Sequence, residues 1–185
     1  FDKRKYLISR SGFSKQGGFE IHTDNIEGAL ELYDYFFEIG KEFNLKPGTP
    51  NHPERIEGGL LSYGSDMDIF DNPFECGFDK YVDLNSDIVF LGRENLIKIK
   101  EKGIKKKLMG VKIESKSIDV SQGIPMLDLK ENEVGQLRSA AYSPKFNKVV
   151  GIAMIEKKFL EVAKKFKINI DGNFVSGEIC NLPIV

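Results

Sequence analysis

Residues 165–182 have the sequence KFKINIDGNFVSGEICNL. Two runs rich in alternating apolar residues flank Asp171-Gly172-Asn173, and an Asp-Gly pair between two such runs is typical of a tight β-hairpin. Four further strand-like runs precede this hairpin, with turn residues between them: 108–115, 124–129, 134–142 and 148–155. Short strands at this spacing predict a small barrel or sandwich.

The first part of the chain has a different pattern. Apolar and aromatic residues recur at helical spacing from Asn25 to Glu42, which predicts an amphipathic helix whose aromatic stripe lies in a core. Shorter elements are expected as strands at 5–10 and 19–23 and as helices at 54–61 and 92–102. The fold class is therefore α+β, with an α/β part up to about residue 105 and an all-β part after it.

Charge and cysteine usage exclude some classes of protein. The 27 basic and 28 acidic residues nearly cancel, which argues against a nucleic-acid-binding protein. The lysine run at 98–107 has no interleaved aromatic residues and is expected to be a solvated helix end and turn. The apolar runs are shorter than a membrane span. Cys76 and Cys180 lack metal-type spacing, so we expect two buried apolar side chains in a reducing cytoplasm.

The α/β part contains too few strands to close its own sheet. The chain also begins at Phe1 without an initiator Met and runs almost at once into strand-like sequence, as a truncated product would. We therefore expect neighbouring strands to lie upstream.

Several collinear segments resemble one known family. Residues 10–21, RSGFSKQGGFEI, resemble its R-T-G-Y-T-G-E-D-G-F-E-I segment, and residues 55–66, RIEGGLLSYGSD, resemble R-L-E-A-G-x-x-x-Y-G-x-D. Shorter matches follow at 72–78, 90–93, 135–139, 142–144 and 151–153. In this order they resemble the glycine-cleavage T-protein (aminomethyltransferase) family over essentially the whole chain.

This resemblance implies a domain organisation. Family members are about twice as long and fold as three domains around a central folate cavity. Residues 1–80 would form the second part of the folate-binding α/β domain, and residues 81–185 the C-terminal β-barrel domain. The missing N-terminal half of the same polypeptide is the expected partner, and a homodimer is left open. Tetrahydrofolate is the implied cofactor.

Two departures from the family pattern favour one branch. Lys15-Gln16-Gly17-Gly18 stands where T-proteins have G-E-D-G, and Pro50-Asn51-His52 where they have A-R-D. Both are similar to the enzymes that demethylate dimethylsulfoniopropionate. The implied function is methyl transfer from this sulfonium to tetrahydrofolate, giving methyltetrahydrofolate and methylthiopropionate, with the 185 residues alone inactive. The alternatives are aminomethyl transfer in glycine cleavage, or a folate-binding module without turnover.

The first group of candidate site residues surrounds the second strand. Glu20 and His22 are two apart, so both point to one face, while Phe19 and Ile21 face the core. The resemblance assigns Glu20 to reading the pterin; the other interpretation is an exposed strand acid. Phe13 and His22 are implied pocket-wall positions, where the demethylases tend to have tryptophan and tyrosine.

The second group of candidates lies at 55–66. Arg55 either holds a folate glutamate tail or pairs with Glu54, Glu57 or Asp66, and Tyr63 is a candidate for the cavity wall. Gly58-Gly59 in a helix is costly, which suggests that a ligand or a neighbouring domain approaches the backbone closely there. No catalytic nucleophile or metal cluster is recognised. A sulfonium needs none, because its leaving group is a neutral thioether and catalysis can rest on proximity and orientation.

Overall fold

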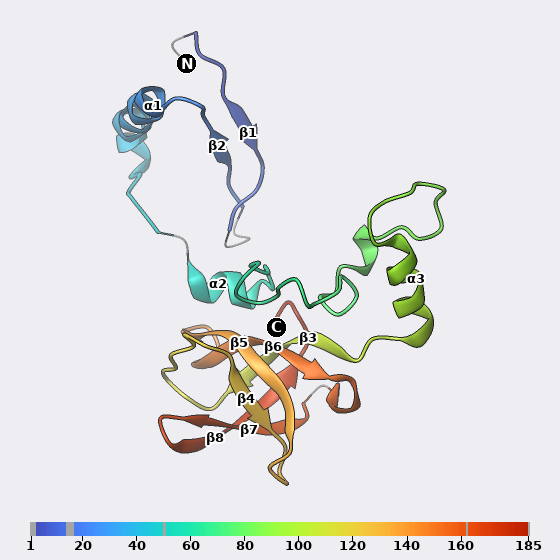
Figure 1. The fold of residues 1–185 in the computed structure, drawn as a ribbon. Coiled ribbons are helices and arrows are strands. Elements are labelled where there is room, and N and C mark those ends of the chain that lie inside the picture. Colours follow the sequence, from blue (N-terminus) through green and yellow to red (C-terminus); the bar gives the residue numbers. More distant parts are fainter. Residues whose placement is uncertain (1–2, 14–16, 50, 162, 185) are drawn as a thin grey trace. The chain divides into compact units, whose positions relative to one another are not determined.

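The computed structural model describes residues 3–13, 17–49, 51–161 and 163–184 (Figure 1). These residues divide into two compact units, 1–51 and 52–185, which are described one at a time. Lys15, Gln16 and Pro50, which carry part of the departures noted above, lie outside the described residues. The domain boundary near residue 80 stays a prediction.

The first unit consists of a hairpin and a helix. Strand β1 (Leu7–Ser9) pairs antiparallel with β2 (Glu20–His22), and Ser9 lies opposite Glu20. Helix α1 (Ile26–Ile39) follows and continues into a 3₁₀ turn, η1 (Gly40–Phe43). The Asn25 side chain caps α1 by accepting a 2.7 Å hydrogen bond from the Gly28 N–H, which satisfies one of the unpaired donors of the first turn.

The aromatic stripe of α1 is not a core face in the described residues, so that prediction is wrong. Ile26, Leu30 and Tyr33 are exposed, as is Phe43 beyond the helix. Phe19 and Ile21 on β2 are also exposed, contrary to expectation. The physical reason is size: two three-residue strands offer too little apolar surface to cover a helix of this length.

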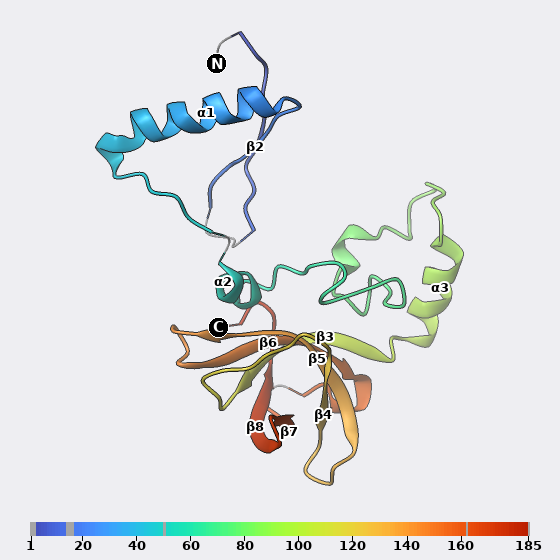
Figure 2. The ribbon, with the colours of Figure 1, turned by 60° about the vertical axis from the view of Figure 1, so that its left-hand side comes forward.

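The second unit is built on a closed barrel of six antiparallel strands (Figures 1 and 2). The strand pattern left open a barrel or a sandwich, and the barrel that the family resemblance implied is confirmed. Its strands follow the order β3-β6-β5-β4-β7-β8 around the wall. Their bounds are β3 (Lys106–Ile113), β4 (Ile124–Leu127), β5 (Glu133–Ser143), β6 (Lys148–Glu156), β7 (Lys165–Ile170) and β8 (Asn173–Cys180).

The hairpin predicted at 165–182 is confirmed. Ile170 lies opposite Asn173 in the ladder, which leaves Asp171 and Gly172 as the turn. Their φ angles are 51° and 85°, and two positive values in succession define the type I′ turn that matches the twist of the flanking strands. Asp and Gly tolerate this conformation, so the turn sequence fixes the register of β7 and β8.

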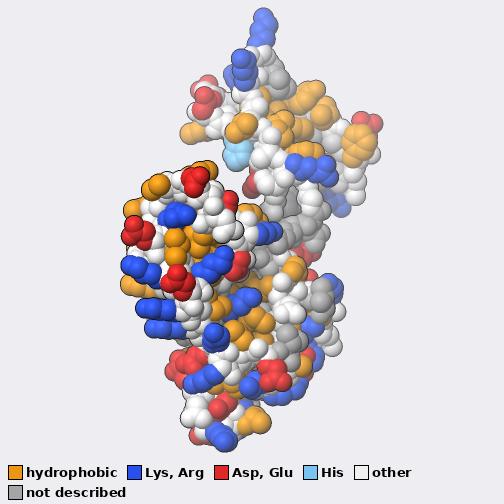
Figure 3. All heavy atoms as spheres, turned by 90° about the vertical axis from the view of Figure 1, so that its right-hand side faces the viewer, with side chains coloured by type: hydrophobic (Ala, Val, Ile, Leu, Met, Phe, Trp, Pro, Cys, Tyr) orange, Lys and Arg blue, Asp and Glu red, His pale blue; other side chains and the backbone are white. Residues whose placement is uncertain are grey.

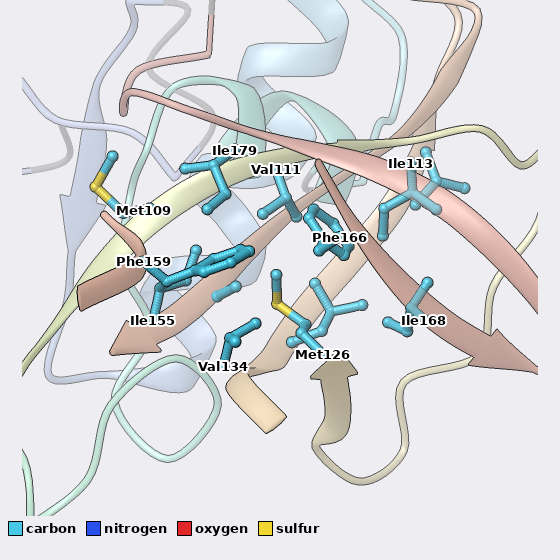
Figure 4. Packing of buried hydrophobic residues seen from close by; sticks show 13 residues of the cluster. Met109, Val111, Ile113, Met126, Val134, Ile155, Phe159, Phe166, Ile168 and Ile179 are labelled. Atoms are coloured by element: carbon cyan, nitrogen blue, oxygen red, sulfur yellow. The ribbon is translucent and has the colours of Figure 1, made fainter. Parts of the chain in front are cut away.

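Strand β6 is buried on both faces. Val149, Ala153 and Ile155 point into the barrel interior, where the described cluster also contains Met126 and Phe166, whose side chains lie close together (Figure 4). On the outer face, β6 contributes Val150, Ile152 and Met154 to a second apolar cluster. A strand buried on two faces reads as a continuous apolar run, which explains the sequence VVGIAMI at 149–155.

Helix α2 (His52–Glu57) covers part of that outer face. Ile56 of α2 and Ile184 near the end of the chain both join the outer cluster, and the Ile184 N–H donates to the Glu57 carbonyl at 2.8 Å. The barrel is therefore sealed on this side by a helix and by a segment more than a hundred residues later in sequence.

The glycine pair after α2 ends the helix. The Leu60 N–H bonds to the Arg55 carbonyl at 2.9 Å and the Gly59 N–H to the Ile56 carbonyl at 3.0 Å, with Gly59 at φ 63°, which is the Schellman arrangement. The expected close approach is confirmed, because a β-carbon at Gly59 would lie 3.2 Å from Leu182 Cβ. The approaching group is the chain's own terminal segment.

Helix α3 (Arg93–Lys102) carries much of the lysine run, and the remainder enters β3. Lys98, Lys100 and Lys102 are exposed as predicted, whereas Lys106 is half-buried and pairs with Asp71. On the face that carries α3, basic and hydrophobic side chains are interspersed (Figure 3). Two single 3₁₀ turns, η2 (Asp79–Tyr81) and η3 (Lys157–Phe159), complete the unit. Within the described residues, no helix has the length and apolar character needed to cross a membrane.

The packing of β5 against β6 yields a test of the barrel. A β-carbon at Gly135 would lie 2.5 Å from the Met154 carbonyl oxygen and 3.0 Å from Ile155 Cα. Because backbone cannot move aside cheaply, Gly135→Ala is expected to lower the free energy of unfolding by about 1–3 kcal/mol. Urea denaturation measures the change. Ser176→Ala, at an exposed position of β8, should stay within about 0.5 kcal/mol, and a Gly135 variant equal to it would contradict the packing described.

Candidate functional site

Glu20 and His22 lie on one face of β2, as the two-residue spacing predicts. The Ser11 hydroxyl donates to Glu20 Oε2, and the Ser9 hydroxyl lies 2.9 Å from that of Ser11 and 3.3 Å from His22 Nε2. All four side chains lie at the surface of the first unit or are only partly covered. The arrangement presents a carboxylate and an imidazole on one face of β2, contacted by hydroxyls from the last residue of β1 and from the loop that follows it.

The loop between β1 and β2 borders this cluster. Phe13 is exposed within it, and Gly17 and Gly18 have φ angles of 80° and 129°, values that favour glycine. Arg10 lies with its guanidinium 6.0 Å from the centre of the Phe19 ring. The described part of the loop therefore keeps an aromatic ring, Phe13, accessible on the first unit.

Arg55 forms a buried ion pair in the second unit. Its side chain is 2% exposed and that of Asp66 is 0% exposed, and Arg55 Nη1 lies 2.6 Å from Asp66 Oδ2. Arg55 also donates to the Leu60 carbonyl at 3.3 Å and to Ser139 Oγ at 3.0 Å. Of the two interpretations of Arg55, the structure therefore shows the internal pair, and the partner is Asp66.

A second ion cluster adjoins the first through Asp66. Arg138 Nη1 donates to the Asp66 carbonyl oxygen at 2.9 Å and to the Asp71 carboxylate, which also accepts from Lys106. Desolvation raises the pKa of Asp71, but the hydrogen bonds from Arg138 and Lys106 outweigh it, so the pKa lies below its usual value. Asp71 is accordingly ionised at neutral pH and holds Arg138 in place.

His52 and Tyr63 lie at the edge of this network. His52 is exposed at the first position of α2, and its Nδ1 accepts a long 3.4 Å hydrogen bond from Arg55 Nε. Burial, and after it the Arg55 charge, lowers the pKa of His52, so the ring is neutral at pH 7. Tyr63 is 70% exposed in a turn.

The described residues offer little for nucleophilic or metal chemistry. Burial raises the pKa of the Cys76 and Cys180 thiols to about 11, so neither is a thiolate at neutral pH. Both are unpaired cysteines, and Cys76 is buried as predicted, whereas Cys180 is only partly buried. Among the described residues, no group of three or more His, Cys, Asp or Glu side chains could hold a metal ion.

The five sequence-predicted site residues divide between the units. Phe13, Glu20 and His22 belong to the first, and Arg55 and Tyr63 to the second. Sequence reasoning missed Arg138, Ser139 and Asp71, which complete the surroundings of Arg55. Arg138 and Ser139 lie in the segment 135–139 that resembles the family, so the signal was present. Nothing in the spacing shows that they would meet α2.

Comparison with sequence models of known families matches both parts of the chain. Residues 1–86 match the GCVT N-terminal domain, and residues 106–185 match the glycine cleavage T-protein C-terminal barrel domain. The two matches follow one another along the chain, part of the N-terminal domain first and the C-terminal barrel domain second. The chain belongs to the glycine-cleavage T-protein family.

Individual relatives agree with this. The chain is 35% identical over 157 residues to a dimethylsulfoniopropionate demethylase from Ruegeria pomeroyi, covering 85% of this chain and 42% of that protein. It is 31% identical over 170 residues to an aminomethyltransferase from Thermoanaerobacter pseudethanolicus, covering 89% and 44%. The chain spans about half the length of the curated relatives it matches.

A solved structure shares the fold. The glycine cleavage system aminomethyltransferase T from Bartonella henselae superposes with a TM-score of 0.86 at 20% identity, covering 99% of this chain and 50% of that one. The α+β class with a partial α/β part and a C-terminal barrel is confirmed. The exposed stripe of α1 fits this coverage, because half of the related fold has no counterpart here.

The Arg55–Asp66 pair generates a stability prediction. Asp66→Asn removes the buried countercharge of Arg55 and is expected to cost about 3–5 kcal/mol of unfolding free energy. Denaturant titration of the barrel unit, followed by circular dichroism, measures it. Asp68→Asn is the matched control: Asp68 is exposed and accepts from the Phe70 N–H, which asparagine can also do. Equal effects of the two substitutions would show that the buried pair contributes nothing.

Proposed function

We propose that this chain is part of a tetrahydrofolate-dependent methyltransferase whose methyl donor is dimethylsulfoniopropionate. The observation that carries the proposal is the accessible Glu20 carboxylate on β2, beside a glycine-containing loop. It is supported by the 35% identity to a protein named as a demethylase of this compound. A reducing cytoplasm suits the two unpaired cysteines.

The residues around Glu20 fit a pterin. An ionised carboxylate accepts two parallel hydrogen bonds, and the amino group and ring N–H of a pterin offer two adjacent donors. Ser11 uses one oxygen of Glu20, and each carboxylate oxygen has a second acceptor position. The His22 and Phe13 rings lie on the same unit and would form a polar and an apolar part of the pterin pocket's wall.

The proposed methyl transfer depends on the relative position of donor and acceptor more than on acid or base groups. The C–S bond of the sulfonium breaks with both electrons left on sulfur, so methylthiopropionate leaves as a neutral thioether. Tetrahydrofolate, when bound, supplies the N5 amine that accepts the methyl group and releases a proton to solvent. Glu20 and its neighbours would contribute by fixing the pterin, which is catalysis by orientation.

The remainder of the family fold is proposed to cover α1. Ile26, Leu30 and Tyr33 form an exposed apolar face, and burying such a face is worth roughly 25 cal/mol per Å². The complementary half of the same polypeptide is the occupant that the half-length coverage of the relatives supports. The homodimer stays a prediction.

The donor is tested with the polypeptide as its gene encodes it and, in parallel, with the 185 residues alone. We expect methylthiopropionate and methyltetrahydrofolate from the former, when dimethylsulfoniopropionate and tetrahydrofolate are supplied, and no turnover from the latter. Aminomethyl-lipoyl carrier protein serves as the competing donor. Ammonia release from that carrier without methylthiopropionate would replace the proposal by glycine-cleavage aminomethyl transfer. Folate binding with neither product would make the chain a binding module.

The role of Glu20 has a separate test. In the polypeptide as its gene encodes it, Glu20→Gln is expected to weaken folate binding by about 1.5–3 kcal/mol, the range for a hydrogen bond to a charged group. The melting temperature without ligand should change little. Calorimetric titration with 5-formyltetrahydrofolate gives the affinity. Glu42→Gln, an exposed acid on the same unit, should leave it unchanged. An unchanged affinity for 5-formyltetrahydrofolate in the Glu20 variant would show that Glu20 does not bind the pterin and is only a surface acid.

A further inference from the structure

A pocket of about 940 Å³ lies beside α3 in the second unit, and this volume falls in the range of roughly 300–1,000 Å³ that is usual for small-molecule sites. One wall is α3 with the segment that follows it, and the other contains residues of the segment 70–75. Arg55, Asp66 and Arg138 do not line it. The lining residues that matter here are Phe70, Glu75, Lys98, Lys102, Ile104 and Lys105.

The wall formed by α3 carries positive charge that the described residues do not neutralise. Three lining lysines have no ion-pair partner among those residues, and they are Lys98, Lys102 and Lys105. The first two are four residues apart on the helix and therefore share one face. Two other charged lining residues already have partners, because Lys106 is bound to Asp71 and Glu156 to Lys158. The free charge of this wall thus favours an anionic ligand.

Glu75 is a buried acid in this basic surrounding. It is 5% exposed and lines the pocket, and its carboxyl group accepts one hydrogen bond from the described residues, a long one of 3.4 Å from the Asn72 N–H to Oε2. Its backbone is fixed on both sides, since its N–H donates to Asn72 Oδ1 at 3.1 Å and its carbonyl accepts from the Leu108 N–H at 2.8 Å. A buried carboxyl group with free acceptor positions is costly, and a ligand that donates to it removes this cost.

The lysines decide what kind of donor suits Glu75. They repel a cationic ligand group, so a neutral group with paired N–H donors fits better than an ammonium. Guanine presents a ring N–H and an amino group side by side, and a carboxylate accepts two such parallel hydrogen bonds. Phe70 is 85% exposed and lines the same pocket, so it offers a ring on which a base can stack. Lysine ammonium groups bind phosphate as point charges.

We propose that this pocket binds a guanine nucleotide, with the base on Glu75 and the phosphates on Lys98, Lys102 and Lys105. The partly buried Ile104 adds apolar surface to the same wall. No step of the proposed methyl transfer requires a nucleotide, and no residue of the Glu20 cluster lines the pocket. The pocket is therefore a second binding site, independent of the proposed function.

A series of nucleotides tests the base. Calorimetric titration is done on the polypeptide as its gene encodes it, with 5-formyltetrahydrofolate present at saturation so that a folate site is filled. GDP is expected to bind most tightly. IDP lacks the amino group and should bind at least about tenfold more weakly, because one hydrogen bond to the carboxyl group is lost. ADP has no such pair of donors and should bind more weakly still. Equal affinities of the three, or no GDP binding at about 1 mM, would overturn the proposal.

Charge reversals on α3 test the phosphate end. Lys98→Glu and Lys102→Glu are each expected to weaken GDP binding about tenfold, since each exchanges an attractive charge for a repulsive one near a partly screened phosphate. Lys100→Glu is the matched control, because Lys100 is exposed on the same helix and does not line this pocket. Its effect should be less than about threefold. Equal effects at 98 and 100 would mean that only the general charge of the helix attracts the nucleotide, and the assigned pocket would be wrong.

The role of Glu75 is read from a ratio of affinities. Glu75→Gln exchanges one acceptor for an amide donor, so the affinities for GDP and IDP should come within about threefold of each other. Circular dichroism checks that the variant is folded. An unchanged ratio in the folded variant contradicts the placement of the base. If the variant does not fold, the nucleotide series and the lysine variants still decide the proposal, because they leave Glu75 in place.

Discussion

The buried pair between Arg55 and Asp66 ties together segments that are otherwise far apart in sequence. A guanidinium and a carboxylate without water must satisfy each other and their remaining donors and acceptors locally. Arg55 therefore gathers the end of α2, the turn at 62–66 and β5 through Asp66, Leu60 and Ser139. The backbone carbonyl of Asp66 also accepts a hydrogen bond from Arg138, which donates to Asp71 as well. Asp71 in turn accepts from Lys106 at the start of β3. This chain of contacts holds α2 against the barrel.

The barrel could be predicted from sequence because its signals are local. Each strand has its own apolar pattern, and the residue types of Asp171-Gly172 predict the tight turn that the structure contains. All six strands therefore lie within a few residues of their expected bounds. The strand pattern alone did not distinguish a barrel from a sandwich, because closure depends on which edges pair; only the family resemblance implied the barrel. The pairing of β3 with both β6 and β8 leaves no mark in the pattern of β3 itself.

The site was less predictable for a related reason. Glu20 and His22 share a face because of a two-residue period, which any strand would give. Arg55 had three acids within reach in sequence, and only the fold selects Asp66, eleven residues away, over Glu54 and Glu57. Ser139 meets Arg55 across 84 residues, a contact that no periodicity encodes. The prediction that the apolar face of α1 lies in a core was wrong for a different reason. The helical periodicity was right, but such a pattern indicates only that a face is apolar and not which segment covers it.

The contact of the terminal segment with α2 has a consequence for the order in which the molecule matures during synthesis. Helix α2 leaves the ribosome long before Ser139, and Ile184 is added later still, yet its N–H closes on Glu57. Until that segment emerges, the outer apolar cluster around Ile56 lacks Ile184, and Gly59 lacks the neighbour for which its missing side chain leaves room. The apolar cover over the outer face of β6 is thus completed last, although α2 is made early. A ribosome that stalled within β8 would hold a chain that has every residue of the Arg55–Asp66 network but lacks the terminal segment that covers Gly59 and joins the outer apolar cluster.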